Sequence, residues 1–121
     1  MWVFTQDGFI SVVDNHQRKG FLTARSRDRQ SLIAIAEIAD CEIEFTPMRD
    51  YQYRTFVTRE QYSEWLALQS EMLDYGNFKD QVHKTLGDTF YHACGEVWHA
   101  MNMVQDDEAA QWTKDRYAAR A

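Results

Sequence analysis

The chain has 121 residues, of which 45% are apolar and 14% aromatic, and it carries a formal net charge of −6 at pH 7. This length and composition predict one folded domain and exclude both a disordered chain and two independent cores. Basic and acidic residues number eight against nine in residues 1–60, and five against ten in residues 61–121. Because duplex nucleic acid needs a basic surface, we expect no duplex nucleic acid partner.

The sequence also argues against a membrane or exported protein. No apolar run approaches the roughly 18 residues that a membrane-spanning helix needs, and the first residues lack the basic segment of a signal peptide. Cys41 and Cys94 lie far apart without a Cys-x-x-Cys spacing, which indicates free thiols rather than a disulfide or a zinc site. We therefore expect a cytoplasmic protein without a cofactor.

Residues 1–58 have the pattern of an antiparallel sheet with one helix. Asp7-Gly8 predicts a hairpin turn between the first two strands, and Asp28 can cap a helix. That helix has a buried stripe at Leu32, Ile35, Ala36 and Ala39, and the strand-like runs are residues 2–5, 9–13, 21–25, 41–45 and 51–57. The predicted order is three strands, one helix and two strands, which makes residues 1–121 a single α+β domain with helices after the sheet.

From residue 59 onward the apolar spacing becomes helical. Thr58 and Gln61 fit a capping box for a helix whose apolar face runs from Tyr62 to Leu73. Asn77 can cap a short helix that Gly87 closes. The sequence then predicts a helix from Asp88 to about Val104, and a separate last helix that begins at the acidic residues 106–108.

The helix after Asp88 carries more apolar surface than a small sheet needs. Phe90, Cys94, Val97, Met101 and Val104 alternate at spacings of four and three, and Tyr91 and Trp98 widen this stripe. We interpret it as an interface of a homo-oligomer, a dimer or higher; the alternative is burial within one chain against the Tyr62–Leu73 helix. The aromatic residues expected in the interior are Phe4, Phe9, Phe21, Phe45 and Trp65.

Two arginine clusters are candidate anion sites. Trp112, Arg116 and Arg120 are spaced by four residues and share a helix face, where two guanidinium groups can grip a phosphate while the indole stacks on a base. The alternative is a solvated helix end in which Asp115 and Glu108 pair with the arginines. Arg25, Arg27 and Arg29 precede a helix N-terminus and form a second candidate, although alternating arginines also occur as a solubilising device.

The sequence does not favour catalysis. Asp88, His92, Glu96 and His99 share one helix face, and Glu96 and His99 have the Glu-x-x-His spacing of di-iron bundles, but the second such motif is missing. An exposed polar face is therefore the favoured interpretation, and we expect no metal site. No serine has the surroundings of a nucleophile, and no glycine-rich phosphate loop is present. We expect a binding protein rather than an enzyme.

Two short motifs carry a resemblance to a known family. The opening Met1-Trp2-Val3-Phe4-Thr5, followed by Gly8-Phe9-Ile10-Ser11-Val12-Val13, and the later Tyr75-Gly76-Asn77-Phe78-Lys79 are similar to small bacterial and phage proteins. Within that group, the order of a sheet followed by helices resembles the first-described family of Thoeris anti-defence proteins. Those are phage sponges that bind cyclic ADP-ribose isomers made by host TIR-domain enzymes without degrading them.

The resemblance implies a ligand-binding pocket between protomers. Arg54, Phe78, Arg116 and Arg120 match, in order and approximate spacing, the family's strand arginine, helix-starting aromatic and paired C-terminal arginines. We add Asn77 and Trp112 to this expected set. The family's pocket asparagine has no sure counterpart, because Asn102 comes too late and Asp88 stands nearest the expected place. The resulting hypothesis is sequestration of a cyclic ADP-ribose isomer; the alternative is an acidic inhibitor or adaptor of a host defence protein.

Overall fold

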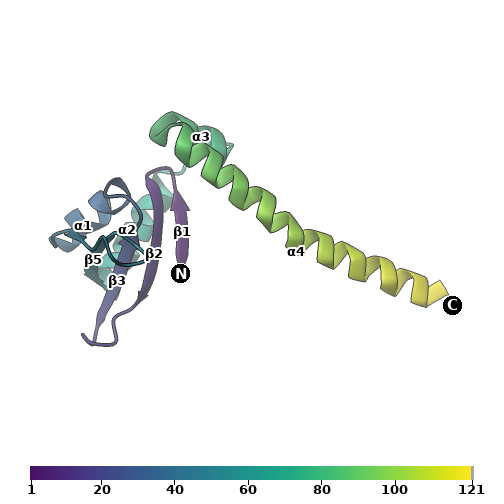
Figure 1. Ribbon diagram of the computed structural model, residues 1–121, viewed down its shortest axis with the longest axis horizontal. Coiled ribbons are helices and arrows are strands. Elements are labelled where there is room, and N and C mark those ends of the chain that lie inside the picture. Colours follow the sequence, from purple (N-terminus) through teal and green to yellow (C-terminus); the bar gives the residue numbers. More distant parts are fainter. Residues whose placement is uncertain (121) are drawn as a thin grey trace.

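The computed structural model describes residues 1–120, and Ala121, the last residue of the predicted helical part, lies outside the described residues. The chain forms a five-stranded antiparallel sheet followed by helices, so the predicted α+β fold class is confirmed. The strand order is β1-β2-β3-β5-β4, and Figure 1 shows a long C-terminal helix that leaves the body of the protein. The strands are β1 (Trp2–Thr5), β2 (Gly8–Asp14), β3 (Phe21–Ser26), β4 (Glu44–Phe45) and β5 (Tyr53–Thr58).

One face of the sheet packs against two helices and forms the core. The 3-10 turn η1 (Gln30–Leu32) leads into α1 (Ile33–Ala39), and α2 (Arg59–Glu71) follows β5. Trp65 of α2 is 2% exposed, which confirms its predicted place in the interior. The other buried members of this cluster are Ile10, Val12, Leu22, Ala24, Leu32, Ile35, Val57 and Tyr62.

The opposite face of the sheet carries side chains that the sequence analysis assigned to the core. Successive residues of a strand point to opposite faces, so Phe4 and Phe9, which are register partners, lie on the face away from Ile10. Both rings are partly buried and stack with centroids 4.5 Å apart. The predicted interior position of Phe4 and Phe9 is therefore wrong, and Phe45 is also wrongly placed because it is 54% exposed.

The ends of the predicted strands lie within two residues of the observed ones, except at β4. Residues 41–45 alternate like a half-buried strand, but only Glu44–Phe45 pair with β5, and both are exposed. Thr55 explains part of this, because its hydroxyl donates to the Glu42 carbonyl and holds the chain before β4 without a ladder. β5 begins at Tyr53 rather than at residue 51.

Local capping defines the helices where the sequence predicts it. Thr58 and Gln61 form the predicted capping box at the start of α2, with both hydrogen bonds present. Asn77 caps α3 (Phe78–Leu86) by accepting from the backbone N–H of Asp80 at 3.0 Å, and Gly87 follows its end. Asp28 accepts a hydrogen bond from the Ser31 hydroxyl at 2.6 Å instead of capping backbone N–H groups.

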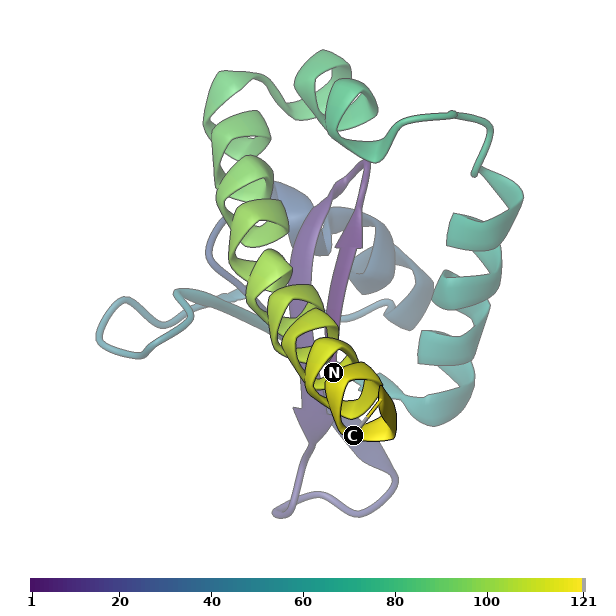
Figure 2. The ribbon, with the colours of Figure 1, turned by 90° about the vertical axis from the view of Figure 1, so that its right-hand side faces the viewer.

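The predicted break near residue 105 does not occur. A single helix, α4 (Asp88–Arg120), runs for 33 residues, so the prediction of two C-terminal helices is wrong. The acidic residues 106–108 resemble a helix start, but neither glycine nor proline interrupts the chain between Gly95 and Arg120, and helix propagation continues through them. Only the first turns of α4 lie beside the sheet and α3, and the rest projects away (Figures 1 and 2).

Gly8 sits where β2 approaches the turn before α1. Its φ is +143°, and a Cβ placed there would lie 1.9 Å from the Ser31 hydroxyl oxygen. That same hydroxyl accepts from the Phe9 backbone N–H at 3.1 Å. The hairpin forms as predicted, but its turn is centred on Gln6 and Asp7 rather than on Asp7-Gly8, so Gly8 is needed for this close approach and not for the centre of the turn.

We predict that Gly8→Ala destabilises the protein by about 2–4 kcal/mol, because the new methyl group must displace Ser31 and the backbone must keep a positive φ. Urea denaturation followed by circular dichroism measures this change. The matched control is Gly20→Ala, which has a φ of +87° but open space around its Cβ position. Equal losses in the two variants would contradict the proposed close contact.

Candidate functional site

The projecting part of α4 exposes large apolar side chains. Val97 is 40% exposed, and Met101 and Val104 are 59% and 60% exposed, so the predicted stripe is not buried within the chain beyond Cys94. The alternative of burial against the Tyr62–Leu73 helix is therefore wrong for these residues. Trp98 and Trp112 are also exposed, at 59% and 60%. The oligomer interface predicted for this helix stays a prediction, and exposed apolar side chains of this size are typical of interaction surfaces.

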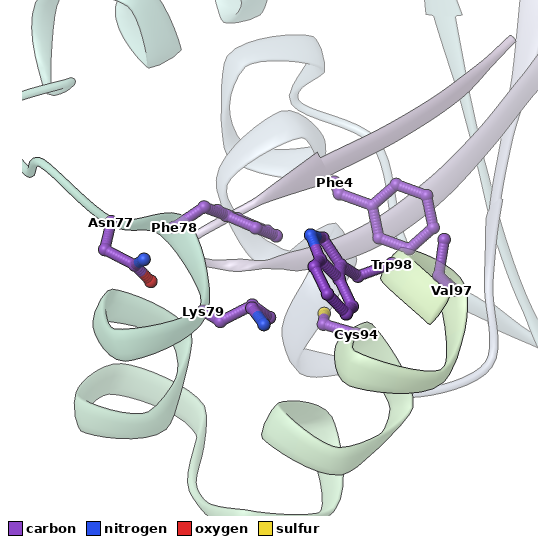
Figure 3. A pocket seen from close by; sticks show the side chains of 7 residues that line it. All are labelled: Phe4, Asn77, Phe78, Lys79, Cys94, Val97 and Trp98. Carbon is purple, nitrogen blue, oxygen red and sulfur yellow. The ribbon is translucent and has the colours of Figure 1, made fainter. Parts of the chain in front are cut away.

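Phe78, at the start of α3, lines a hollow between α3, α4 and β1. The hollow holds about 430 Å³, and we call it the Phe78 hollow (Figure 3). The Phe78 side chain points towards the Trp98 indole, and the Lys79 ammonium lies 4.4 Å from the centroid of that indole ring. The lining residues are Phe4, Asn77, Phe78, Lys79, Cys94, Val97 and Trp98.

The chemistry of the Phe78 hollow suits a flat aromatic group. Phe78 and Trp98 present ring faces, and Asn77 can add a polar contact through its amide NH2, since its oxygen already caps α3. Lys79 is the one cationic residue in the lining. The hollow therefore offers a place for a base but lacks the paired guanidinium groups that grip a phosphate.

Trp112, Arg116 and Arg120 lie together at the far end of α4, as their spacing predicts. They line a small hollow on the exposed helix with Thr113 and Tyr117, and the Arg116 guanidinium stands 5.0 Å from the Trp112 ring centroid. Within residues 1–120 neither arginine forms an ion pair, and Asp115 instead accepts from the Gln111 amide at 2.9 Å. The predicted pairing of these arginines with Asp115 and Glu108 is thus absent.

Arg54 lies next to Arg25 rather than in the Phe78 hollow. The two residues are direct register partners on β5 and β3, and they share the outer face of the sheet. We call them the Arg25–Arg54 pair. The Nε atoms of both are buried without a hydrogen-bond partner. Burial, and then the charges of Arg49 and Arg25, lower the pKa of Arg54 from its ordinary value.

The other two arginines of the predicted Arg25, Arg27 and Arg29 cluster lie in different surroundings. Arg27 stands 4.6 Å above the Tyr51 ring, as Arg25 does, and donates to the Asp50 carbonyl at 3.0 Å. Arg29 is exposed and lines a separate hollow beside α1 with Glu37 and Asp40. The predicted set is therefore divided, and only Arg25 and Arg27 contact a common group.

The predicted pocket residues form three separate groups within one chain. Asn77 and Phe78 belong to the Phe78 hollow, Arg54 to the Arg25–Arg54 pair, and the last three to the end of α4. From Trp98 to Arg116 the helix rises about 27 Å, so Arg116 cannot reach the Phe78 hollow of its own chain while α4 is straight. A pocket with all these residues needs more than one copy of the chain.

The sequence analysis did not identify Phe4 and Tyr51 as residues that line a hollow. Phe4 was assigned to the core because alternation along a strand does not reveal which face is covered. Tyr51 was read only as a strand residue, but it is 5% exposed and carries Arg25 and Arg27 on its ring. The approach of two arginines to one tyrosine depends on contacts that a single sequence does not display.

The candidate metal residues of α4 remain apart from any ligand cluster. His92, Glu96 and His99 are exposed, and the Asp88 carboxylate accepts from Nε2 of His83 at 2.6 Å. Among residues 1–120 no group of three or more His, Cys, Asp or Glu side chains is arranged to hold a metal ion. In the same part of the chain, no helix has the length and apolar character required to cross a membrane.

The comparisons with known proteins do not add an assignment. No family model matches the chain, and neither the curated proteins nor the solved structures gave a match.

The two cysteines differ in their environment. Both are free, but Cys94 is buried and Cys41 is partly exposed, and burial raises the pKa of the Cys94 thiol. Because the thiolate is the reactive form, we predict that iodoacetamide at pH 8 alkylates Cys41 about tenfold or more faster than Cys94. Peptide mass spectrometry over time measures both rates. Equal rates in the folded protein would contradict the packing of α4 against β1, and equal rates in urea are the control.

Proposed function

We propose that the protein binds and sequesters a cyclic ADP-ribose-type signalling nucleotide without degrading it, in an assembly of two or more copies. The observation that carries the proposal is that the residues suited to a base and the residues suited to phosphates lie in two distant parts of one chain. The Phe78 hollow offers aromatic rings for a base, and the end of α4 offers Arg116 and Arg120, which form no ion pair within residues 1–120. A ligand with a purine base and a pyrophosphate needs both halves.

The surface of α4 supports the pairing of two copies. Residues three and four apart form a strip along this helix from Trp98 to Arg120, which we call the α4 strip. The acidic residues 106–108 lie outside it, so it contains no carboxylate that would repel its counterpart. The α4 strip consists of Trp98, Met101, Asn102, Gln105, Ala109, Trp112, Arg116 and Arg120.

Antiparallel pairing along the α4 strip would complete the pocket. The midpoint between Trp98 and Arg116 falls between Gln105 and Ala109, which are uncharged and allow two helices to approach. A two-fold axis at that point sets Arg116 of one copy opposite Trp98 of the other, at the mouth of its Phe78 hollow. Each pocket then contains the aromatic residues for the base from one copy and Arg116 with Arg120 for the phosphates from the other.

The proposed pocket contains Phe78, Asn77, Trp112, Arg116 and Arg120. We leave Arg54 out of it, because Arg54 faces Arg25 on the outer face of the sheet and lines no part of the Phe78 hollow. Sequestration requires tight binding and no acid–base group, so it is consistent with a pocket of aromatic and arginine side chains. The proposal places the protein in the cytoplasm, that of the host cell if a phage encodes it.

We predict that isothermal titration calorimetry with cyclic ADP-ribose isomers detects micromolar or tighter binding of at least one isomer. The double variant Arg116→Ala/Arg120→Ala should weaken this binding about 100-fold or more, because two charge-assisted contacts to the phosphates are lost. Lys114→Ala is the matched control, since it removes an exposed cation from the same helix turn outside the α4 strip and should leave the affinity unchanged.

The samples from this titration also show whether the protein degrades the ligand. Mass spectrometry of the ligand released by heat should return the intact isomer. Absence of binding to every isomer, or equal affinities for the double variant and the wild type, would contradict the proposal.

A second candidate function is an acidic inhibitor or adaptor that binds a host protein through α4. The supporting observation is the proximity of exposed apolar side chains, Met103 and Val104, to the acidic residues 106–108. A basic host protein could pair with both. Capture of one stoichiometric host protein, lost on Val104→Asp and unaffected by Arg116→Ala/Arg120→Ala, would favour this candidate over nucleotide sequestration.

A further inference from the structure

The outer face of the sheet carries an arrangement that the proposed pocket does not use. Arg25 and Arg54 stand directly opposite each other on neighbouring strands, where like charges are unfavourable. Arg25 donates to the Ser11 hydroxyl at 2.7 Å, but this neutral acceptor offsets no charge. Neither arginine has an ion pair among residues 1–120, although Glu44 is the register partner of Arg54 on its other side.

The Arg25–Arg54 pair lacks hydrogen-bond acceptors and a paired negative charge, and this indicates the kind of group that it would bind. Both Nε atoms lack an acceptor, neither arginine forms an ion pair among residues 1–120, and the charges of Asp50 and Glu44 offset those of Arg49 and Arg25 at Arg54 only in part. A phosphate brings several oxygen acceptors and negative charge, and it can bridge two guanidinium groups. The Arg27 guanidinium lies 4.6 Å from the centroid of the Tyr51 ring, which Arg25 also contacts, and it adds to the positive potential despite its contact with Asp50.

An aromatic hollow adjoins this cluster. It holds about 450 Å³ between β1, β2 and the first turns of α4, and we call it the Phe9 hollow. Tyr51 connects it to the arginines, because the Tyr51 ring carries Arg25 and lies 6.4 Å from the Phe9 ring. Trp2 meets Phe9 edge to face at 5.9 Å and is 70% exposed, so its ring can reorient over a ligand. The polar groups at the rim are Arg27 and Asp28.

We propose that the Arg25–Arg54 pair and the Phe9 hollow form a second nucleotide site, distinct from the pocket that α4 would complete. The phosphate binds across Arg25 and Arg54, and the base enters the Phe9 hollow past Tyr51. All residues of this site belong to one copy of the chain, so its occupancy does not require assembly. The inference is independent of the proposed function, because the second site uses neither Arg116 and Arg120 at the end of α4 nor Phe78.

The test uses full-length protein with Arg116→Ala/Arg120→Ala, which removes the phosphate grip of the other pocket. Pyrophosphate and ADP are the two probes, in a buffer without phosphate or sulfate. We expect both to raise the melting temperature of this protein, and ADP to bind more tightly than pyrophosphate because its base gains the Phe9 hollow.

Two variants added to this background assign the contacts. Arg54→Gln should weaken both probes about tenfold or more, and should raise the melting temperature of the ligand-free protein by a few degrees, because a like-charge contact is removed. Phe9→Leu should weaken ADP and leave pyrophosphate unchanged. Arg59→Gln is the control, because Arg59 is an exposed arginine that contacts Asp14 at 3.4 Å.

Three results would overturn the second site. These are no thermal shift with either probe, equal affinities for Arg54→Gln and Arg59→Gln, and ADP binding no tighter than pyrophosphate. Absence of cyclic ADP-ribose binding to the wild-type protein, with both probes still bound by the double variant, would contradict only the proposed function.

Discussion

A straight helix that extends beyond its own fold is the constraint on which the functional account depends. About half of α4 projects from the body of its own chain, and Trp98, Met101, Trp112, Arg116 and Arg120 share one face of this helix, with both tryptophans and Met101 exposed. Isolated helices of this kind gain most of their stability from packing of an apolar face. The proposed function assigns this exposed length of α4 to assembly, which would determine which of the proposed pocket residues can meet.

The sheet provides the fixed frame for this arrangement. Its inner face packs on α1 and α2 and contains the buried core, whereas its outer face presents Phe4, Phe9, Arg25 and Arg54. The first turns of α4 lie against the edge formed by β1, so Cys94 is buried there. The same contact forms one wall of the Phe78 hollow and one wall of the Phe9 hollow. Both candidate sites thus depend on how α4 leaves the sheet.

The sequence predicts those parts of the fold that depend on neighbouring residues. The capping box of Thr58 and Gln61 and the Asn77 cap are confirmed because each uses a side chain and a backbone group three residues apart. The spacing of Trp112, Arg116 and Arg120 likewise places them on one face. Phe4 and Phe9 could not be placed in this way, because which face of the sheet is covered depends on α1 and α2. The adjacency of Arg25 and Arg54 comes from the register of β3 with β5, which local patterns do not specify.

The central claim is that one pocket takes Phe78 from one copy and Arg116 with Arg120 from another. Co-expression of Phe78→Ala and Arg116→Ala/Arg120→Ala chains, each with its own affinity tag, followed by purification through both tags, gives only mixed assemblies. Calorimetry with the isomer that the wild type binds then counts the sites. A mixed dimer should regain about half of the wild-type sites, because one of its two pockets combines two intact halves. No regained binding, while each variant still assembles, would contradict a pocket shared between copies.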